Sequence, residues 1–376
     1  MMRFSTLIRH PADWMAGGQG EDGPVLTSRI RLARNLRHHP FPGWAKREQR
    51  GAALAAMLPA VETLPVMKDA FSQILSTLNP VQKQVLVERH LISREHAARG
   101  EGSAAVVERR QTFSFMLNEE DHLRMQAIRP GLQLSAAFDA LSELDSQLEK
   151  SLEFAFDPAL GYLTTCPTNL GTGMRASAML HLPALVLSDQ IGQVLQAVNK
   201  IGLAVRGLYG EGTESLGNLY QISNQSTLGE SEPSIIRRLE RVIAQVAEHE
   251  QNARGKLLEV DPNMVADKIG RAYGVLRHAH VINSKEALTH LSLLRMGASL
   301  GFFPKETVIL CDTLLLEIQP AHLQLLTGRK LAPEERDAIR AEIVRSRLHS
   351  LDSPDTRWRK PPDIAPPSPP ANPGDS

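Results

Sequence analysis

The sequence predicts an α+β fold joined to an all-α region. Before about residue 255, short segments rich in β-branched and aromatic residues alternate with amphipathic helical patterns. Beyond that point the pattern is almost wholly helical, and the end of the chain is rich in proline. We therefore expect an α+β body over residues 1–255, an all-α domain over residues 258–350 and a disordered tail over residues 353–376.

Helices and strands are expected in a definite order along the body. Residues 45–100 are rich in Ala, Leu, Gln and Glu and are punctuated by prolines, which favours helices. Residues 105–118 are typical of a strand or hairpin arm, and residues 133–149 of a helix. Shorter segments typical of strands follow, at residues 152–156, 160–165, 203–208 and 217–222.

The helical part of the chain begins with clear periodic signals. After Pro233, apolar residues recur at helical spacing: Ile235, Ile236, Leu239, Val242, Ile243 and Val246. Asp261 and Pro262 then supply an N-cap and a proline at the first helical position. A further helix is therefore expected to begin there.

Composition limits the class of protein. The chain of 376 residues has 42 basic and 42 acidic side chains, which argues against a general nucleic-acid binder. Hydrophobic residues make up 42% of the chain, enough for a sizeable core. No apolar run approaches the ~18 residues of a membrane span, and Arg9, His10 and Pro11 interrupt the N-terminus before a secretory core could form. We expect a cytoplasmic protein that binds neither nucleic acid nor a membrane.

Two arginines alternate in the segment Thr27-Ser28-Arg29-Ile30-Arg31. In a strand, Arg29 and Arg31 point to the same face. Two adjacent guanidinium groups repel each other unless an anion lies between them. The segment is therefore either a solvated surface strand or part of an anion site.

An acidic run follows the expected strand at residues 105–118. It reads Asn-Glu-Glu-Asp-His-Leu-Arg and spans residues 118–124. Such a run is usually a solvated turn, and a functional role for Glu120 or Arg124 needs partners from elsewhere in the chain.

Cys166 opens a polar loop that contains two glycines. Residues 166–177 read Cys-Pro-Thr-Asn-Leu-Gly-Thr-Gly-Met-Arg-Ala-Ser, and we expect this loop to open a helix near Arg175. A helix N-terminus favours phosphate through its free N–H groups and its dipole. With Cys311 as the only other cysteine, a disulfide framework and a four-cysteine zinc site are both excluded. Cys166 has either a direct role in chemistry or an inert packing role.

A fourth segment places one arginine and two glutamates among three glycines. Residues 205–214 read Val-Arg-Gly-Leu-Tyr-Gly-Glu-Gly-Thr-Glu, and an amphipathic strand follows. Glycines in such a cluster allow close approach of the backbone to a ligand.

Together and in this order, the four segments resemble the phosphagen (ATP:guanido) kinase family. CPTNLGTGMRAS and RGLYGEGTES are specific, NEEDHLR adds to them, and the resemblance covers roughly residues 20–255. Metazoan creatine and arginine kinases have a helical domain of about a hundred residues before the segment of Arg29. This chain has a helical domain after the catalytic body instead, as do the similar bacterial protein-arginine kinases. The resemblance implies a curved antiparallel sheet flanked by helices.

The resemblance also implies a site for ATP and Mg²⁺. Phosphoryl transfer needs in-line positioning and neutralisation of phosphate charge, and the planar fork of arginine binds phosphate oxygens in pairs. Mg²⁺ would bridge the phosphates, so no metal site made of protein side chains is expected. The residues implied at the nucleotide are Thr27, Ser28, Arg29, Ile30, Arg31, His90, Arg124, Arg175, Ala176, Ser177, Ala178, Met179, Arg206, Gly207, Leu208, Tyr209 and Gly210.

The acceptor implied by the resemblance is a guanidinium group. Its pKa of about 12.5–13.8 makes it protonated and a poor nucleophile. Carboxylates paired with its N–H groups can hold it in line and accept the departing proton. The resemblance assigns this task to Glu120 and Glu211. Cys166, as a thiolate near the same cation, would add charge stabilisation, since neighbouring arginines favour the thiolate. Tyr209 stands where metazoan arginine kinases carry a further arginine, which favours an acceptor other than free arginine.

A further match lies in the helical domain. Arg336-Asp337-Ala338-Ile339-Arg340-Ala341 fits the RDxxRA motif, which in bacterial protein-arginine kinases forms an allosteric phosphoarginine pocket from the residues equivalent to Arg336, Asp337, Arg340 and Ala341. The alternative is an exposed charged helix with Glu334 and Asp337 as local ion-pair partners.

The resemblance further implies protein substrates with exposed arginine, a zinc-containing activator protein, a Clp-type protease that receives the product, a role in the stress response, and a homodimer.

Three functions remain open at this point. The favoured one is an ATP-dependent protein-arginine kinase. The first alternative is a small-molecule phosphagen kinase that acts on free arginine or another guanidino compound. The second is an inactive adaptor that reads phosphoarginine. It predicts loss of the catalytic carboxylates or arginines, whereas Glu120 and Glu211 are present, as are Arg29, Arg31, Arg124, Arg175 and Arg206.

Overall fold

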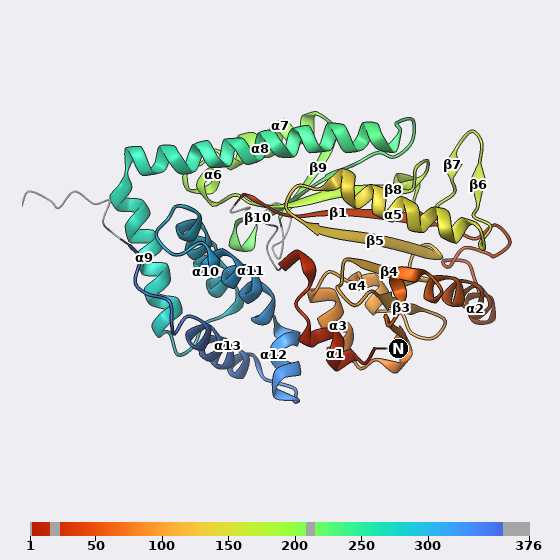
Figure 1. The fold of residues 1–376 in the computed structure, drawn as a ribbon, viewed down its shortest axis with the longest axis horizontal. Helices are drawn as coiled ribbons and strands as arrows, with labels where there is room; N and C mark the ends of the chain where they lie inside the picture. Colours follow the sequence, from red (N-terminus) through yellow and green to blue (C-terminus); the bar gives the residue numbers. More distant parts are fainter. Residues whose placement is uncertain (1, 16–22, 208–214, 356–376) are drawn as a thin grey trace, which may run out of the picture.

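The computed structural model describes residues 2–15, 23–207 and 215–355. In these ranges one eight-stranded sheet forms the centre of the molecule, in the order β2-β3-β4-β5-β1-β8-β10-β9, and all neighbouring strands are antiparallel (Figure 1). A two-stranded hairpin lies outside it. The strands are β1 (Val25–Arg34), β2 (Phe71–Ile74), β3 (Ala104–Val107), β4 (Phe113–Leu117), β5 (Leu123–Pro130), β6 (Phe156–Asp157), β7 (Gly161–Tyr162), β8 (Met174–His181), β9 (Leu203–Gly207) and β10 (Leu219–Asn224).

Helices cover this sheet and continue into a separate helical region after it (Figure 1). The helices along the body are α1 (Phe4–Arg9), α2 (Arg47–Glu62), α3 (Pro80–Glu88), α4 (Arg94–Ala97), α5 (Leu134–Glu149), α6 (Pro183–Leu187), α7 (Ile191–Lys200) and α8 (Glu232–Val260). The helical region consists of α9 (Pro262–His278), α10 (Ser284–Ser299), α11 (Glu306–Glu317), α12 (Pro320–Thr327) and α13 (Pro333–Arg347). An α+β fold with a C-terminal helical region is therefore confirmed.

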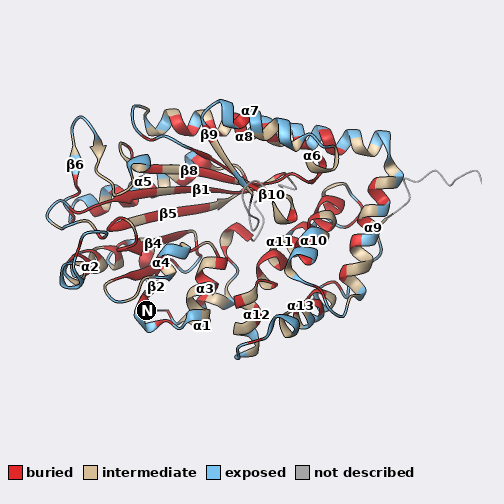
Figure 2. Cartoon of the chain, turned by 180° about the vertical axis from the view of Figure 1, so that it is seen from behind, coloured by how far each residue is buried: buried red, intermediate tan, exposed pale blue. Residues whose placement is uncertain are grey.

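One face of the sheet is apolar and packs against α5 and α8. Side chains alternate between the two faces of a strand, so Ile30 and Leu32 of β1 share a face with Ala176 and Ala178 of β8. These residues are almost fully buried, together with Leu141 of α5 and with residues of α8. The burial colours show the same division along the strands and helices (Figure 2). Burial of this face fixes the register of the strands and directs the alternate residues to the other side.

Several expected elements are confirmed and several are wrong. The helix expected at residues 133–149 is α5, and Asp261 caps α9 by accepting a hydrogen bond from the Met264 N–H at 3.0 Å. Residues 45–100 contain strand β2 as well as helices. The expected strands at 152–156 and 160–165 shrink to the two-residue strands β6 and β7. The tail beyond residue 355 lies outside the described residues.

The loop at residues 171–173 leads into a strand, not into a helix as expected. Gly173 has a φ of +65°, and a Cβ there would lie 2.6 Å from the Ala33 carbonyl oxygen. The same glycine accepts a hydrogen bond from the Ala33 N–H at 2.9 Å through its own carbonyl oxygen. Glycine is therefore required because β8 enters the sheet in close contact with the end of β1. Arg175 consequently lies on a strand.

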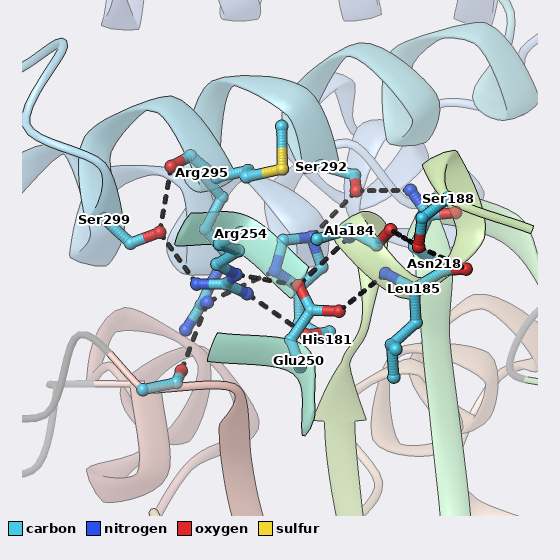
Figure 3. A network of polar contacts seen from close by, with 12 residues as sticks. His181, Ala184, Leu185, Ser188, Asn218, Glu250, Arg254, Ser292, Arg295 and Ser299 are labelled. Carbon is cyan, nitrogen blue, oxygen red and sulfur yellow. Dashed lines mark hydrogen bonds and ion pairs between the residues drawn. The ribbon is translucent and has the colours of Figure 1, made fainter. Parts of the chain in front are cut away.

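A buried polar network joins the sheet to the helical region (Figure 3). His181, at the end of β8, lies 2.7 Å from the Ser292 hydroxyl of α10 through its Nε2 atom. Arg254 of α8 donates to Glu250 at 2.7 Å and to Ser299 of α10 at 2.8 Å. Burial, reinforced by nearby arginines, lowers the pKa of His181 well below its usual value. A polar junction that is buried and hydrogen-bonded in this way fixes one relative position of the elements it connects.

Across the described ranges, none of the helices combines the length and the apolar character that a bilayer crossing requires.

Candidate active site

Five arginines share the polar face of the sheet, opposite to α5 and α8. Arg29 and Arg31 alternate along β1, and Arg31 lies directly across from Arg175 of β8. Arg124 of β5 lies across from Ala33, two residues further along β1. Arg206 of β9 lies across from Gln221 of β10, which in turn lies across from Met179 of β8. Since directly opposed residues of antiparallel strands point to the same side, the sheet brings together arginines that are far apart in the sequence.

These guanidinium groups have few partners in the described structure. Arg29 donates to the Gln221 side-chain oxygen at 3.1 Å, and Arg175 donates to the Ser223 hydroxyl at 3.1 Å. The Nε atoms of Arg31 and Arg175 are buried without a hydrogen-bond partner in the described ranges. Buried donors of this kind are costly unless a ligand accepts from them.

The electrostatics of this face favour an anion. Burial, followed by the charges of Arg124 and Arg175, lowers the pKa of Arg29 to about 10. Burial and the neighbouring Arg29 lower the pKa of Arg31 well below its usual value. Burial and then Arg206 lower the pKa of Arg175, while Cys166 acts in the opposite direction. Each shift shows that positive charge is crowded and desolvated here, and a bound phosphate chain would relieve both effects.

Glu119 is a residue of this site that the sequence alone did not identify. It is buried and accepts a hydrogen bond from Arg124 Nη1 at 2.7 Å through Oε2, and its other oxygen accepts from the Ser93 hydroxyl. Burial alone would raise the pKa of Glu119, but the charge and hydrogen bond of Arg124 outweigh it and hold that pKa below its usual value. Glu119 and Arg124 therefore form an ion pair, which orients the Arg124 guanidinium on the arginine-lined face of the sheet.

Glu120 follows in the turn between β4 and β5 and is half-buried. Burial, followed by the charge of Asp121, raises the pKa of Glu120. Asp121 is itself buried and accepts hydrogen bonds at 2.7 Å from the Asn35 amide and at 2.7 Å from the Thr165 N–H. The Thr165 hydroxyl also donates to the Glu120 carbonyl oxygen at 3.0 Å. These bonds fasten the acidic turn to the loop that carries Cys166.

Cys166 is half-buried in that loop. Its Sγ atom lies 3.0 Å from the Thr168 hydroxyl, and its carbonyl oxygen accepts from the Thr164 hydroxyl at 2.8 Å. Its neighbour Thr165 bonds to Asp121 and to the Glu120 carbonyl oxygen, so the loop that carries Cys166 lies against the acidic turn. Cys311, in contrast, is fully buried in the helical region.

An aromatic pair borders the other side of the arginines. The rings of Trp14 and His90 lie 5.9 Å apart, and both residues line a small cavity with Arg29. The other residues around this cavity are Thr27, Ile128, Ser177, Met179 and Gln221. Burial, followed by the charge of Arg29, lowers the pKa of His90 to about 3. His90 is therefore a neutral ring beside the cationic face.

The remaining residues expected at the nucleotide are Gly207 and two further groups. The first group lies on the opposite side of the strands: Ser28, Ile30, Ala176 and Ala178 are buried there, so their side chains do not line the arginine face. Gly207 ends β9, across from Tyr220. The second group, Leu208, Tyr209 and Gly210, lies outside the described residues, and so does Glu211, which is expected at the acceptor.

The RDxxRA segment forms part of α13. Arg340 is 1% exposed, and its guanidinium donates to the Ile318 carbonyl oxygen at 3.1 Å, to the Ile282 carbonyl oxygen at 2.9 Å and to Asp337. Ala341 is buried and Arg336 is half-exposed. In this structure Arg340 therefore holds α13 against neighbouring elements, and Arg336 is the more accessible arginine of the segment.

The protein side chains do not assemble a metal site in the described ranges, where no group of three or more His, Cys, Asp or Glu could hold an ion. In nucleotide-dependent phosphoryl transfer, Mg²⁺ is generally held by one or two carboxylates, by water and by the phosphates of the nucleotide. The buried, unpartnered Nε atoms of Arg31 and Arg175 fit such a phosphate chain.

Comparison with known protein families assigns this fold and its arginine-lined face to the guanido phosphotransferases. The model of the ATP:guanido phosphotransferase C-terminal catalytic domain matches residues 58–253, and that of the protein-arginine kinase McsB C-terminal domain matches residues 262–359. The chain belongs to the protein-arginine kinase family of ATP:guanido phosphotransferases.

Relatives and solved structures agree with this assignment. A protein-arginine kinase of Halothermothrix orenii is 46% identical over 93% of this chain and all of its own length. One of Brevibacillus brevis is 44% identical over 91% of this chain and 96% of its own. The crystal structure of lombricine kinase has a TM-score of 0.55 at 26% identity, covering 66% of this chain and 73% of the other. A duplicated taurocyamine kinase of Schistosoma mansoni shares the fold, with a TM-score of 0.56 at 22% identity. The match covers 83% of this chain and 49% of the taurocyamine kinase chain.

Proposed function

We propose that this chain transfers the γ-phosphoryl group of ATP to arginine side chains of proteins. The observation that carries the proposal is the set of arginines on one sheet face, where Arg31 and Arg175 have buried donors without partners. Enzymes of phosphoryl transfer work mainly by positioning and by neutralising charge, which this face can do. The family membership of the chain supports arginine in proteins as the acceptor.

The proposed roles follow from the place of each residue. Arg29, Arg31, Arg124, Arg175 and Arg206 bind the phosphates of ATP, which enters with Mg²⁺ as an additional source of positive charge. Thr27, Ser177 and Met179 border the same face beside His90. The neutral His90 ring and Trp14 border the end of the nucleotide that is remote from Glu120.

Glu120 acts on the acceptor. The guanidinium loses one N–H proton to the Glu120 carboxylate, the freed nitrogen forms a bond to the γ-phosphorus, and the bond from that phosphorus to the ADP oxygen breaks. Burial and Asp121 raise the pKa of Glu120, which makes its carboxylate a stronger base. We assign the second carboxylate to Glu211 and a thiolate that stabilises the cation to Cys166.

The proposal extends to regulation and partners. Arg336, Asp337, Arg340 and Ala341 would form a phosphoarginine pocket, and the helical region would support a homodimer. The division of the chain into a catalytic domain over 1–255 and a helical domain over 258–350 belongs to this proposal. So do a cytoplasmic location, a zinc-containing activator protein and delivery of the product to a Clp-type protease.

The acceptor is tested by supplying labelled ATP with either free arginine or an unfolded model protein. Label in the protein as an acid-labile phosphoramidate supports the proposal. Label only in free arginine would favour a small-molecule phosphagen kinase instead, and no transfer in a single turnover would revive the alternative of a phosphoarginine-binding adaptor.

A further inference from the structure

Helix α12 of the helical region begins against a buried carboxylate of the sheet body. Glu88, the last residue of α3, is 7% exposed. Its Oε1 atom accepts from the Ala321 N–H at 2.9 Å, and its Oε2 atom accepts from the His322 N–H at 3.2 Å. The first N–H groups of a helix have no partner within the helix. Glu88 therefore supplies partners for two of them and joins α12 to α3.

The side chain of His322 strengthens the same contact. Its Nδ1 atom lies 2.8 Å from Glu88 Oε2, and its Nε2 atom accepts from Arg89 Nε at 3.2 Å. Both ring nitrogens are thus engaged by two consecutive residues of the sheet body. These bonds connect positions more than two hundred residues apart in the chain, so they depend on the relative placement of the two parts.

Arg89 extends this contact to the aromatic end of the arginine face. Its Nη2 atom donates to the Ile8 carbonyl oxygen at 2.7 Å, and its Nη1 atom donates to the His10 carbonyl oxygen at 3.0 Å. That N-terminal segment continues to Trp14, whose ring lies 5.9 Å from the His90 ring. Arg89 is therefore connected to both walls of the cavity beside Arg29, through its sequence neighbour His90 and through the segment before Trp14.

His90 itself has a backbone conformation that its surroundings must enforce. Its φ is +59°, in the left-handed region that residues other than glycine rarely adopt. A cavity of about 1070 Å³ lies between α3 and α12, bordered by Glu88, His90, Ala321 and Gln324. Glu88 borders this cavity, and its hydrogen bonds to the first N–H groups of α12 link the two helices there.

We propose that Glu88 and His322 are positioning residues through which α12 sets the nucleotide end of the active site. The pair touches no reacting atom and acts through Arg89 and the backbone of His90. This inference rests on the proposed function only in taking the ligand of the arginine face to be a magnesium nucleotide. The helical region is then a structural part of the ATP site.

The test measures nucleotide affinity separately from turnover in Glu88→Gln, in His322→Ala and in the double variant. Each single change should raise the Kd for Mg·ADP, measured by calorimetry, about fivefold or more. The KM for ATP should rise in parallel, while kcat at saturating ATP stays within about twofold of the unchanged protein. Both changes break the same contact. The Kd of the double variant for Mg·ADP should therefore be no higher than the higher of the two single-variant values.

Asp267→Asn is the matched control. Asp267 forms an exposed ion pair with Arg271 on α9, so this change also removes one negative charge from the chain but none of the contacts to α3. If Glu88→Gln does not fold, His322→Ala tests the same contact from the other side. A Kd for Mg·ADP unchanged in the folded variants, a loss of kcat with unchanged Kd, or additive effects would overturn the inference. Absence of phosphoryl transfer to protein by the unchanged chain would instead overturn the proposed function, and the binding result would remain interpretable.

Discussion

Arg31 of β1 and Arg175 of β8 are directly opposed residues on neighbouring strands, and each has a buried Nε atom without a hydrogen-bond partner in the described ranges. Two desolvated cations in this relationship oppose folding of the empty protein. They persist because the same arrangement favours a ligand with several negative charges. The relationship links the stability of the sheet to the chemistry of the site.

The variant Arg31→Met tests this link. It removes one buried cation and keeps an unbranched, flexible side chain, so the free energy of unfolding without nucleotide should rise by about 1 kcal/mol or more. Phosphoryl transfer should fall by at least ~10²-fold because the phosphates lose one partner. Urea denaturation and initial rates measure the two effects. Arg271→Met on the exposed surface of α9 is the control and should change neither; a less stable Arg31→Met would contradict the account.

The two adjacent glutamates of the acidic turn should behave differently. Glu120→Gln should reduce kcat by at least ~10²-fold with little change in the Kd for Mg·ADP, because it removes the proton acceptor of the reaction. We expect the same of Glu211→Gln. Glu119→Gln should instead weaken nucleotide binding, because Arg124 loses the charged partner that orients it. Equal effects of Glu119→Gln and Glu120→Gln on kcat would mean that the roles are wrongly divided.

The two arginines of the RDxxRA segment should also separate. Arg340→Ala removes a buried cation that serves two carbonyl oxygens and Asp337, and it should destabilise the protein by about 3 kcal/mol. Arg336→Ala should leave stability within about 0.5 kcal/mol and should remove the response of activity to added phosphoarginine. Denaturation and rate measurements with and without phosphoarginine distinguish the two. A response that survives Arg336→Ala would argue against the pocket.

Buried neutral histidines make stability depend on pH. Burial lowers the pKa of His90 to about 3 and those of His96 and His122 to about 4, each chiefly through desolvation. The unfolded chain binds protons at these sites below about pH 6.5, whereas the native protein does not until the pH is far lower. Stability should therefore fall as the pH drops from about 6.5 toward 4 and should be steady above 7. The urea midpoint of unfolding, compared at pH 7.5 and pH 5, measures this loss. The variant His96→Asn should lose less stability between these two pH values, and equal midpoints in the unchanged protein would exclude the effect.

Part of this site follows from local pattern alone. The alternation of Arg29 and Arg31 predicts one face of a strand, and β1 has that form. The place of Arg175 does not follow, because Gly171 and Gly173 are equally typical of a loop before a helix. Pairing of β8 with β1, which lies far away in sequence, decides that the segment is a strand. Long-range pairing of this kind is not encoded in a local window.

Two further residues show the same limit. The sequence indicates that residues 119–121 are acidic, but only the folded turn shows that Glu119 contacts Arg124 while Asp121 contacts Asn35. Arg340 follows Arg336 by four residues, a spacing that is also typical of the exposed face of a charged helix. It is buried because the carbonyl oxygens of Ile318 and Ile282, from other elements, accept its hydrogen bonds.

The most direct test of the central claim is mass spectrometry, under non-acidic conditions, of an unfolded model protein and free arginine incubated together with the chain, ATP and Mg²⁺. The account predicts phosphoarginine in the protein, none as the free amino acid, and loss of the signal in Glu120→Gln. Phosphorylation confined to free arginine, or an undiminished protein signal in Glu120→Gln, would contradict it.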